Sequence, residues 1–195
     1  MENNQTSVQA TKDHCKYCFD VLIATLNKQE LPKFPKNIVK SSTPLFVTWN
    51  IDDDDLRGCI GTFASSAIDK TLGKYAQIAA FQDSRFNPIN QKEVPRLKVS
   101  VSLLVNFEEG KKALDWEVGQ HGIQIDFNVD GQQFGATYLP EVAAEQEWTQ
   151  EEAIKSLVRK AGYRGNYKNV LSSINLTTYQ SSKCKLSYEE YTKIK

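Results

Sequence analysis

Alternation of apolar and polar residues is the sequence feature that most constrains this fold. The segment LKVSVSLLV (97–105) alternates as a strand with one buried face does. The segment GIQIDFNVDGQQFGATYL (122–139) alternates up to an Asp-Gly dipeptide, which is typical of a tight hairpin turn. PLFVTWNI (44–51) and LRGCIGTF (56–63) flank a run of aspartates and make another strand pair. Because the strands arrive in hairpin-like order, the sequence predicts a largely antiparallel sheet.

Helix signals are fewer than strand signals. Residues 15–26 place apolar side chains at helical spacing. Ser66 with Asp69 makes a capping-box pattern before a second helix, and Thr149 with Glu152 makes the same pattern before a third. The predicted fold class is therefore α+β, with largely antiparallel sheets and a few flanking helices.

Composition and charge describe an ordinary globular chain. It has 195 residues, of which 40% are hydrophobic and 25% charged, and 24 basic side chains balance 24 acidic ones. A core can form from this material, and a formal charge of zero attracts neither nucleic acid nor an anionic membrane. We expect a disordered tail over residues 1–9 and a single domain over residues 10–195.

The cysteines indicate a reducing compartment. The polar start of the chain lacks the apolar segment of a secretion signal, and no apolar run is long enough for a membrane helix. We therefore interpret Cys15, Cys18, Cys59 and Cys184 as reduced thiols of an intracellular protein. His14 beside Cys15 suggests a metal motif, but no second pair of ligands completes a zinc set. The sequence predicts no metal site and no cofactor.

The stretch LRGCIGTF contains the candidate reactive site. On a regular strand, Arg57 and Cys59 point to one face, while Leu56 and Ile60 point to the other. If Leu56 and Ile60 enter the core, the guanidinium lies near the sulfur and favours its thiolate form. Cys59 and Arg57 are therefore the first candidate catalytic residues. The alternative is a small cysteine packed in a sheet.

Candidate ligand-binding residues surround this pair. Gly58 and Gly61 have no side chain, so a ligand or another backbone segment can come close. We add Thr62 of the same strand and Arg85 of the segment QDSRFNP to this set. Arg85 either binds an anion or pairs with Asp83, and the sequence leaves both alternatives open. The glycines have an alternative role too, which is to accommodate a β-bulge.

His121 is the candidate base. It is the only histidine outside the first predicted helix, hence the only imidazole placed to assist Cys59. The alternative is a histidine that serves the turn before a strand.

Two charged segments have simpler interpretations. Asp52 to Asp55 lacks the spacing of a calcium loop, so we interpret it as a solvated turn. RKAGYRGNYK (159–168) interleaves basic and aromatic residues, which can bind RNA. One short patch on a neutral chain is more typical of a wet surface, so nucleic acid is not an expected partner.

The motif LRGCIG resembles the AMMECR family, named for the Alport syndrome, midface hypoplasia and elliptocytosis chromosomal region. The resemblance covers about residues 14–192. The segment YCFDVL (17–22) is similar to the corresponding segment of eukaryotic members, and the resemblance implies that this chain is close to the bare domain. The segments that carry it are PLFVTW (44–49), RGCIGTF (57–63), DSRF (83–86), LDWEVGQHGI (114–123), ATYLPEVAAEQ (136–146) and LSYEEY (186–191).

The resemblance implies a fold but no settled activity. It implies two lobes packed into one compact unit, with the motif, here Leu56 to Gly61, near a cleft between them. Microbial relatives are often encoded beside Memo-like and radical S-adenosylmethionine proteins, which implies a shared pathway and a Memo-like or other protein partner. Animal members are discussed as regulators in the cytoplasm or nucleus, the compartments expected here.

Two function hypotheses follow. In the first, Cys59 serves an enzyme or covalent carrier, with Arg57 holding an anionic group. In the second, the chain is a non-enzymatic regulatory or scaffold module that binds a protein partner, and the motif is structural.

Overall fold

The structure, a computed structural model, describes residues 8–194. Its strands are β1 (Ser42–Ile51), β2 (Asp55–Ala67), β3 (Leu97–Lys111), β4 (Gly122–Val129), β5 (Gln132–Tyr138) and β6 (Asn175–Ser187). They are hydrogen-bonded in the order β2-β1-β3-β6-β4-β5. The pairings β1–β2, β1–β3, β4–β5 and β4–β6 are all antiparallel, which confirms the predicted α+β class. The chain divides into two compact units. Unit 1 contains residues 8–103 and 182–194, and unit 2 contains residues 104–181. The predicted tail, residues 1–9, falls mostly outside the described residues and stays a prediction.

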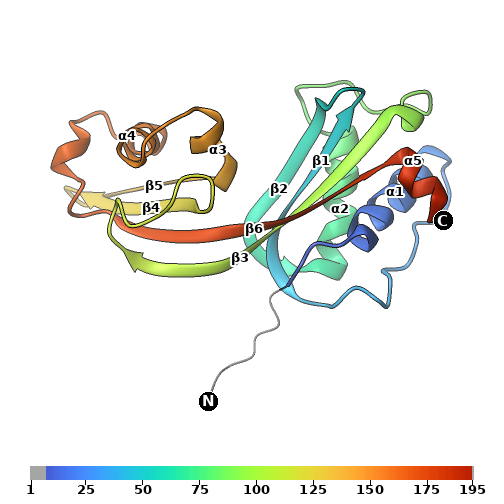
Figure 1. Ribbon diagram of the computed structural model, residues 1–195, viewed down its shortest axis with the longest axis horizontal. Coiled ribbons are helices and arrows are strands. Elements are labelled where there is room, and N and C mark those ends of the chain that lie inside the picture. Colours follow the sequence, from blue (N-terminus) through green and yellow to red (C-terminus); the bar gives the residue numbers. More distant parts are fainter. Residues whose placement is uncertain (1–7, 195) are drawn as a thin grey trace, which may run out of the picture. The chain divides into compact units, whose positions relative to one another are not determined.

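Unit 1 packs helices against one face of its strands (Figure 1). Its elements are α1 (Lys12–Leu26), β1 (Ser42–Ile51), β2 (Asp55–Ala67), α2 (Ile68–Phe81), η1 (Val94–Arg96), the start of β3 (Leu97–Lys111), the end of β6 (Asn175–Ser187) and α5 (Tyr188–Lys193). Trp49 of β1 is fully buried, and its indole Nε1 donates to the backbone oxygen of Ala76 in α2 at 3.0 Å. The ring of Phe19 in α1 lies edge-on to the Trp49 ring, with centroids 5.2 Å apart. Trp49 therefore joins both helices to the strands.

The register of β2 departs from simple alternation. Trp49 lies opposite Gly58, but Asn50 lies opposite Leu56, so Arg57 is the extra residue of a β-bulge. Alternation reverses at a bulge, and Leu56 is 42% exposed. The expectation that Leu56 enters the core is therefore wrong.

The predicted cap of the second helix is also wrong. Ser66 lies in β2 opposite Thr43, and α2 begins only at Ile68, with Ala67 at the N-cap position. The Ile68 N–H donates to the backbone oxygen of Ser41 at 2.9 Å. Because a backbone carbonyl satisfies this helix-start donor, a serine cap is not needed there.

Unit 2 follows the sequence prediction closely. Its elements are the end of β3, β4 (Gly122–Val129), β5 (Gln132–Tyr138), α3 (Pro140–Glu145), α4 (Gln150–Lys160), η2 (Tyr167–Asn169) and the start of β6. Asp130 and Gly131 have φ values of 50° and 82°, as the predicted hairpin turn requires. Thr149 and Glu152 form the predicted capping box, and Gly162, with φ of 100°, follows the end of α4.

The aspartate run forms the predicted turn between β1 and β2, and basic residues pair with it. Arg96 forms an ion pair with Asp52, while Lys98 and Lys185 reach Asp54 at 2.9 and 2.5 Å. Within residues 8–194, no group of three or more acidic, histidine or cysteine side chains is placed to hold a metal ion. No helix in that range has the length and apolar character needed to span a membrane.

Candidate functional site

Cys59 lies on the face of β2 that points away from α2. Thr48 of β1 stands opposite Cys59, and Ser100 of β3 stands opposite Thr48. The Thr48 hydroxyl Oγ1 donates to the Cys59 Sγ at 3.1 Å. The thiol itself is partly exposed. We call this row of Cys59, Thr48 and Ser100 the Cys59 face. It places two hydroxyls and one thiol on adjacent strands, of which Thr48 and Cys59 are partly exposed and Ser100 is buried.

The loop after α2 binds the backbone of Cys59. The Cys59 N–H donates to Asp83 Oδ2 at 2.9 Å, and its carbonyl accepts from Arg85 Nη2 at 3.1 Å. Arg85 also donates to both Asp83 oxygens, at 2.9 and 2.7 Å. Asp83 and Arg85 therefore pair, as the first of the two alternatives predicted. The second alternative, anion binding by Arg85, stays a prediction. Together Asp83 and Arg85 satisfy backbone groups at the free edge of β2.

Charge and burial stabilise the Asp83–Arg85 pair and its hydrogen bonds to the backbone of Cys59. Asp83 is buried, and its pKa lies well below the usual range, first because Arg85 donates to it and then because the N–H groups of Cys59 and Arg85 do. The pKa of Arg85 is raised, mainly by Asp83 and to a smaller extent by Cys59. Arg85 keeps 54% of its side chain exposed. It is thus a solvent-accessible cation bound to the backbone of Cys59, and its anion binding stays a prediction.

Arg57 is held by other residues. Its Nε donates to Glu93 Oε1 at 2.7 Å, and its Nη2 donates to Glu93 Oε2 at 3.2 Å and to the Asn87 carbonyl at 2.8 Å. The Arg57 and Glu93 side chains are only 12% and 16% exposed. The hydrogen bond from Arg57 is the first cause of a lowered pKa at Glu93. The Arg57 Nη1 is enclosed by protein atoms and has no hydrogen-bond partner there, so an anion reaches it only after a rearrangement.

Protein atoms occupy the space beside the motif glycines. A Cβ added to Gly58 would lie 2.1 Å from the backbone oxygen of Ala79 in α2. A Cβ added to Gly61 would lie 2.3 Å from the backbone oxygen of Leu45 and 2.4 Å from the Phe46 ring. These glycines therefore permit close packing of β2. Their binding of a ligand stays a prediction.

Thr62 and His121 have local partners. The Thr62 Oγ1 accepts the N–H of Ala64 at 3.0 Å. In unit 2, His121 Nδ1 accepts the backbone N–H of Glu117 at 3.0 Å. The lone pair of Nδ1 is occupied by this hydrogen bond. The role of His121 as a base for Cys59 stays a prediction, and it first requires loss of the bond to Glu117.

Sequence reasoning did not identify Thr48 and Glu93 as members of the site. Thr48 sits on the polar side of PLFVTWNI, and the strand pairing brings it to Cys59. Glu93 is 36 residues from Arg57, in a segment without regular alternation, and no local signal connects the two.

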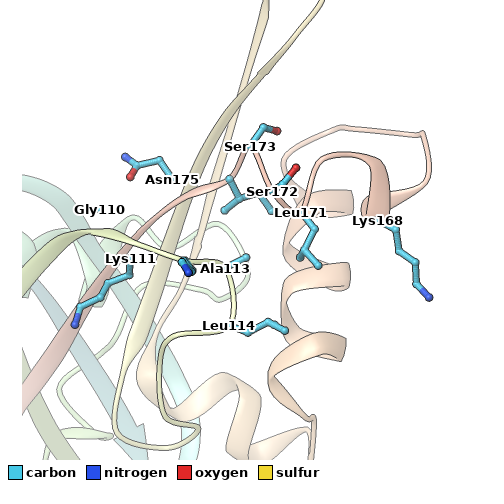
Figure 2. A pocket seen from close by; sticks show the side chains of 11 residues that line it. Gly110, Lys111, Ala113, Leu114, Lys168, Leu171, Ser172, Ser173 and Asn175 are labelled. Carbon is cyan, nitrogen blue, oxygen red and sulfur yellow. The ribbon is translucent and has the colours of Figure 1, made fainter.

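A hollow of about 720 Å³ in unit 2 contains none of the predicted site residues (Figure 2). Ala113, Leu114, Leu171 and Ile174 contribute its apolar lining. Figure 2 shows Lys111 and Lys168 extending away from these apolar side chains. The hollow therefore presents a mostly apolar surface rather than a reactive centre.

Comparisons with known proteins agree with the resemblance seen in the sequence. An uncharacterized protein of Arabidopsis thaliana is 44% identical over 191 residues, covering 94% of this chain and 88% of that protein. One of Schizosaccharomyces pombe is 43% identical over 184 residues, covering 92% and 94%. A solved structure of an uncharacterized Pyrococcus horikoshii protein is similar in fold, with a TM-score of 0.68, 22% identity and coverage of 88% and 89%. The AMMECR1 family model matches residues 15–184, and this chain therefore belongs to the AMMECR1 family.

Proposed function

We propose that the Cys59 face binds an anionic, electrophilic small molecule, with Cys59 as the reacting thiol. The observation that carries the proposal is a partly exposed Sγ that accepts the Thr48 hydroxyl, on a residue whose backbone carbonyl accepts the solvent-accessible guanidinium of Arg85. The thiolate is the nucleophilic form of a cysteine, and the Arg85 cation bound to the same residue can attract an anionic ligand.

The other cysteines support this choice by contrast. Cys15 and Cys18 are fully buried in α1. Burial is the main cause that raises the pKa of each thiol far above its usual value. Cys184 is partly exposed, like Cys59, and serves as the natural reference. A reactive thiol in this chain is therefore sought at Cys59 before the helix cysteines.

The roles of the two arginines are reassigned in this proposal. Arg85 takes the role of the cation that attracts an anionic ligand, because half of its guanidinium-bearing side chain faces solvent. Arg57 positions the strand through its bond to Glu93. The glycines, Thr62 and His121 are not required for the reaction. A pathway shared with a Memo-like protein, in the cytoplasm or nucleus, belongs to the proposal through the family resemblance alone.

A second candidate is a regulatory or scaffold module. It is favoured by the way the protein's own atoms fill the motif, since Gly58 meets α2 and Arg57 meets Glu93. In this case the motif serves stability, and binding of a purified Memo-like protein survives Cys59→Ser. Loss of that binding in a folded Cys59→Ser protein would count against the module.

Alkylation with two reagents tests the thiol site. In each reaction the sulfur lone pair forms the S–C bond, iodide leaves, and the thiol proton goes to water. Iodoacetate is anionic and iodoacetamide is neutral. We expect Arg85→Gln to lower the iodoacetate-to-iodoacetamide rate ratio at Cys59 by about fivefold, because one nearby charge contributes about 1 kcal/mol in a watery setting.

Arg96→Gln is the matched control. Arg96 also pairs with an aspartate, and its side chain is 56% exposed. The iodoacetate-to-iodoacetamide rate ratio at Cys59 should be the same in Arg96→Gln as in wild type. Arg85→Lys, which keeps the positive charge, should retain most of the wild-type ratio. An equal ratio in wild type and a folded Arg85→Gln protein would remove Arg85 from the site.

A further inference from the structure

Positive charge in unit 2 is concentrated in one segment. Residues 155–168 contain five basic side chains and no carboxylate. The rest of the unit, residues 104–154 and 169–181, contains eleven carboxylates and only two lysines. The segment is thus positively charged, whereas the rest of the unit is negatively charged. The net charge of the whole chain, which is zero, does not reveal this difference.

Three of these cations surround one hollow of about 510 Å³. Lys155 and Arg159 line it from α4, one helical turn apart on the same face. Lys168 lines it from η2 across the loop, together with Gly165 to Tyr167. Like charges one turn apart repel on a helix, so this arrangement costs stability unless something neutralises it.

The protein neutralises these cations only in part. Glu151 and Glu152 lie one turn before Lys155 on α4, but among the described residues neither forms an ion pair with it. Within the described residues, Lys155, Arg159 and Lys168 form no ion pair with a carboxylate. Glu152, one turn before Lys155, feels its charge only weakly, since a lowered pKa at Glu152 is due first to Thr149. The carbonyl end of α4 attracts Arg159, which accounts for one of the three cations. Lys160, by contrast, donates to the Thr137 carbonyl at 2.9 Å and lies over the Tyr138 ring.

The walls of the hollow are fixed. Val158 is 1% exposed and belongs to the core of unit 2, against which Tyr167 packs. The Tyr167 hydroxyl donates to Glu151, which ties the loop to the start of α4. The Asn166 side chain accepts the N–H of Lys168 at 3.0 Å. Lys168 also borders the larger hollow lined by Leu114 and Leu171, and Figure 2 shows its side chain extending away from these two residues. The cations therefore stand on a preformed surface.

We propose that this hollow, the α4–η2 pocket, binds the phosphate group of a small soluble molecule. Its volume lies within the range of small-molecule sites, about 300–1,000 Å³, and exceeds what a single phosphate fills. An arginine with two lysines matches the charge and oxygen geometry of a phosphate ester. A long RNA would instead run into the acidic remainder of the unit. The site is independent of Cys59.

Titration with inorganic pyrophosphate, followed by amide NMR, tests the pocket. We expect saturable shifts confined to the amides of Gly165 to Lys168 and to the α4 face. Arg159→Gln and Lys168→Gln should each weaken binding about tenfold, as loss of a charged hydrogen bond does. Arg159→Lys should restore part of it. The matched control is Lys112→Gln, which removes one lysine of the same unit from a different hollow.

Two results would overturn the proposal. One is an equal loss of pyrophosphate affinity in Lys112→Gln and Arg159→Gln, since binding would then follow net charge alone. The other is the absence of saturation in the wild-type protein. A single-stranded oligonucleotide whose affinity rises with its length at this segment would also contradict a small-molecule site and assign the surface to RNA. Circular dichroism of each variant confirms that it is folded.

Discussion

The Asp83 carboxylate accepts the backbone N–H of Cys59 at 2.9 Å, and it also binds Arg85. One buried side chain thereby holds both the edge of β2 and the guanidinium of Arg85. The position of Cys59 consequently depends on residues that follow α2, in addition to its own strand.

Asp83→Asn should destabilise unit 1 by about 2 kcal/mol at neutral pH, because hydrogen bonds to a charged group are weakened or lost in a buried place. Urea unfolding followed by circular dichroism measures this. A free energy of unfolding equal to that of wild type would show that the Asp83 hydrogen bonds contribute no net stability.

The stability difference between wild type and Asp83→Asn should depend on pH. The pKa of Asp83 is lower in the folded protein than in the unfolded chain. Its contribution is therefore complete above the unfolded value of about 3.9 and is lost as the pH falls toward the lower folded value. The stability difference between wild type and Asp83→Asn should shrink as the pH falls below about 4. A difference that grows in acid would contradict this sign.

Arg57 and Glu93 should behave as a coupled buried pair. Arg57→Met or Glu93→Gln alone should cost about 3 kcal/mol, because each leaves the partner's charge buried without compensation. The double variant should cost clearly less than the sum of the two. Urea unfolding of the four proteins completes the cycle. Additive costs would show that the pair does not hold the strand.

Gly58→Ala should destabilise the protein by about 3 kcal/mol, because the new Cβ meets the backbone of α2, which cannot move aside freely. The control is Gly73→Ala within α2, where the new Cβ lies 3.1 Å from the Tyr17 hydroxyl, at the end of a side chain. Gain in helix propensity offsets that contact, so the control should stay within about 1 kcal/mol of wild type. Equal thermal unfolding of both variants would refute the role of Gly58.

His121→Ala should cost about 1 kcal/mol through the lost bond to the Glu117 N–H. We expect the alkylation rate at Cys59 to stay unchanged, because Nδ1 is already occupied. Mass spectrometry of the folded variant measures that rate. A marked slowing would instead assign His121 the role of base.

Local patterns predicted the parts of the fold that local residues determine. The strand over 97–105 and the Asp130-Gly131 turn each depend on neighbouring residues, and both are present in the structure. The strand does not have one buried face alone, since Ser100 and Ser102 on its other side are buried too. The capping box of Thr149 and Glu152 is equally local.

Non-local pairing explains what the sequence could not predict. The bulge at Arg57 depends on how β2 aligns with β1, so alternation alone misplaced Leu56. Glu93, the partner of Arg57, lies 36 residues away in the sequence. Thr48, the partner of Cys59, belongs to an ordinary alternating strand, and nothing in that pattern distinguishes it. The motif residues were recognised from the sequence, whereas their contacts required the strand pairing.

Competitive alkylation of the folded protein by iodoacetamide at neutral pH tests directly whether Cys59 is the reactive thiol. Mass spectrometry follows all four cysteines in one sample. We expect Cys59 to react first, faster than Cys184, while Cys15 and Cys18 remain unmodified until the protein unfolds. A Cys59 that stays unmodified as long as the two buried helix cysteines would contradict a reactive thiol and leave the motif with a structural role.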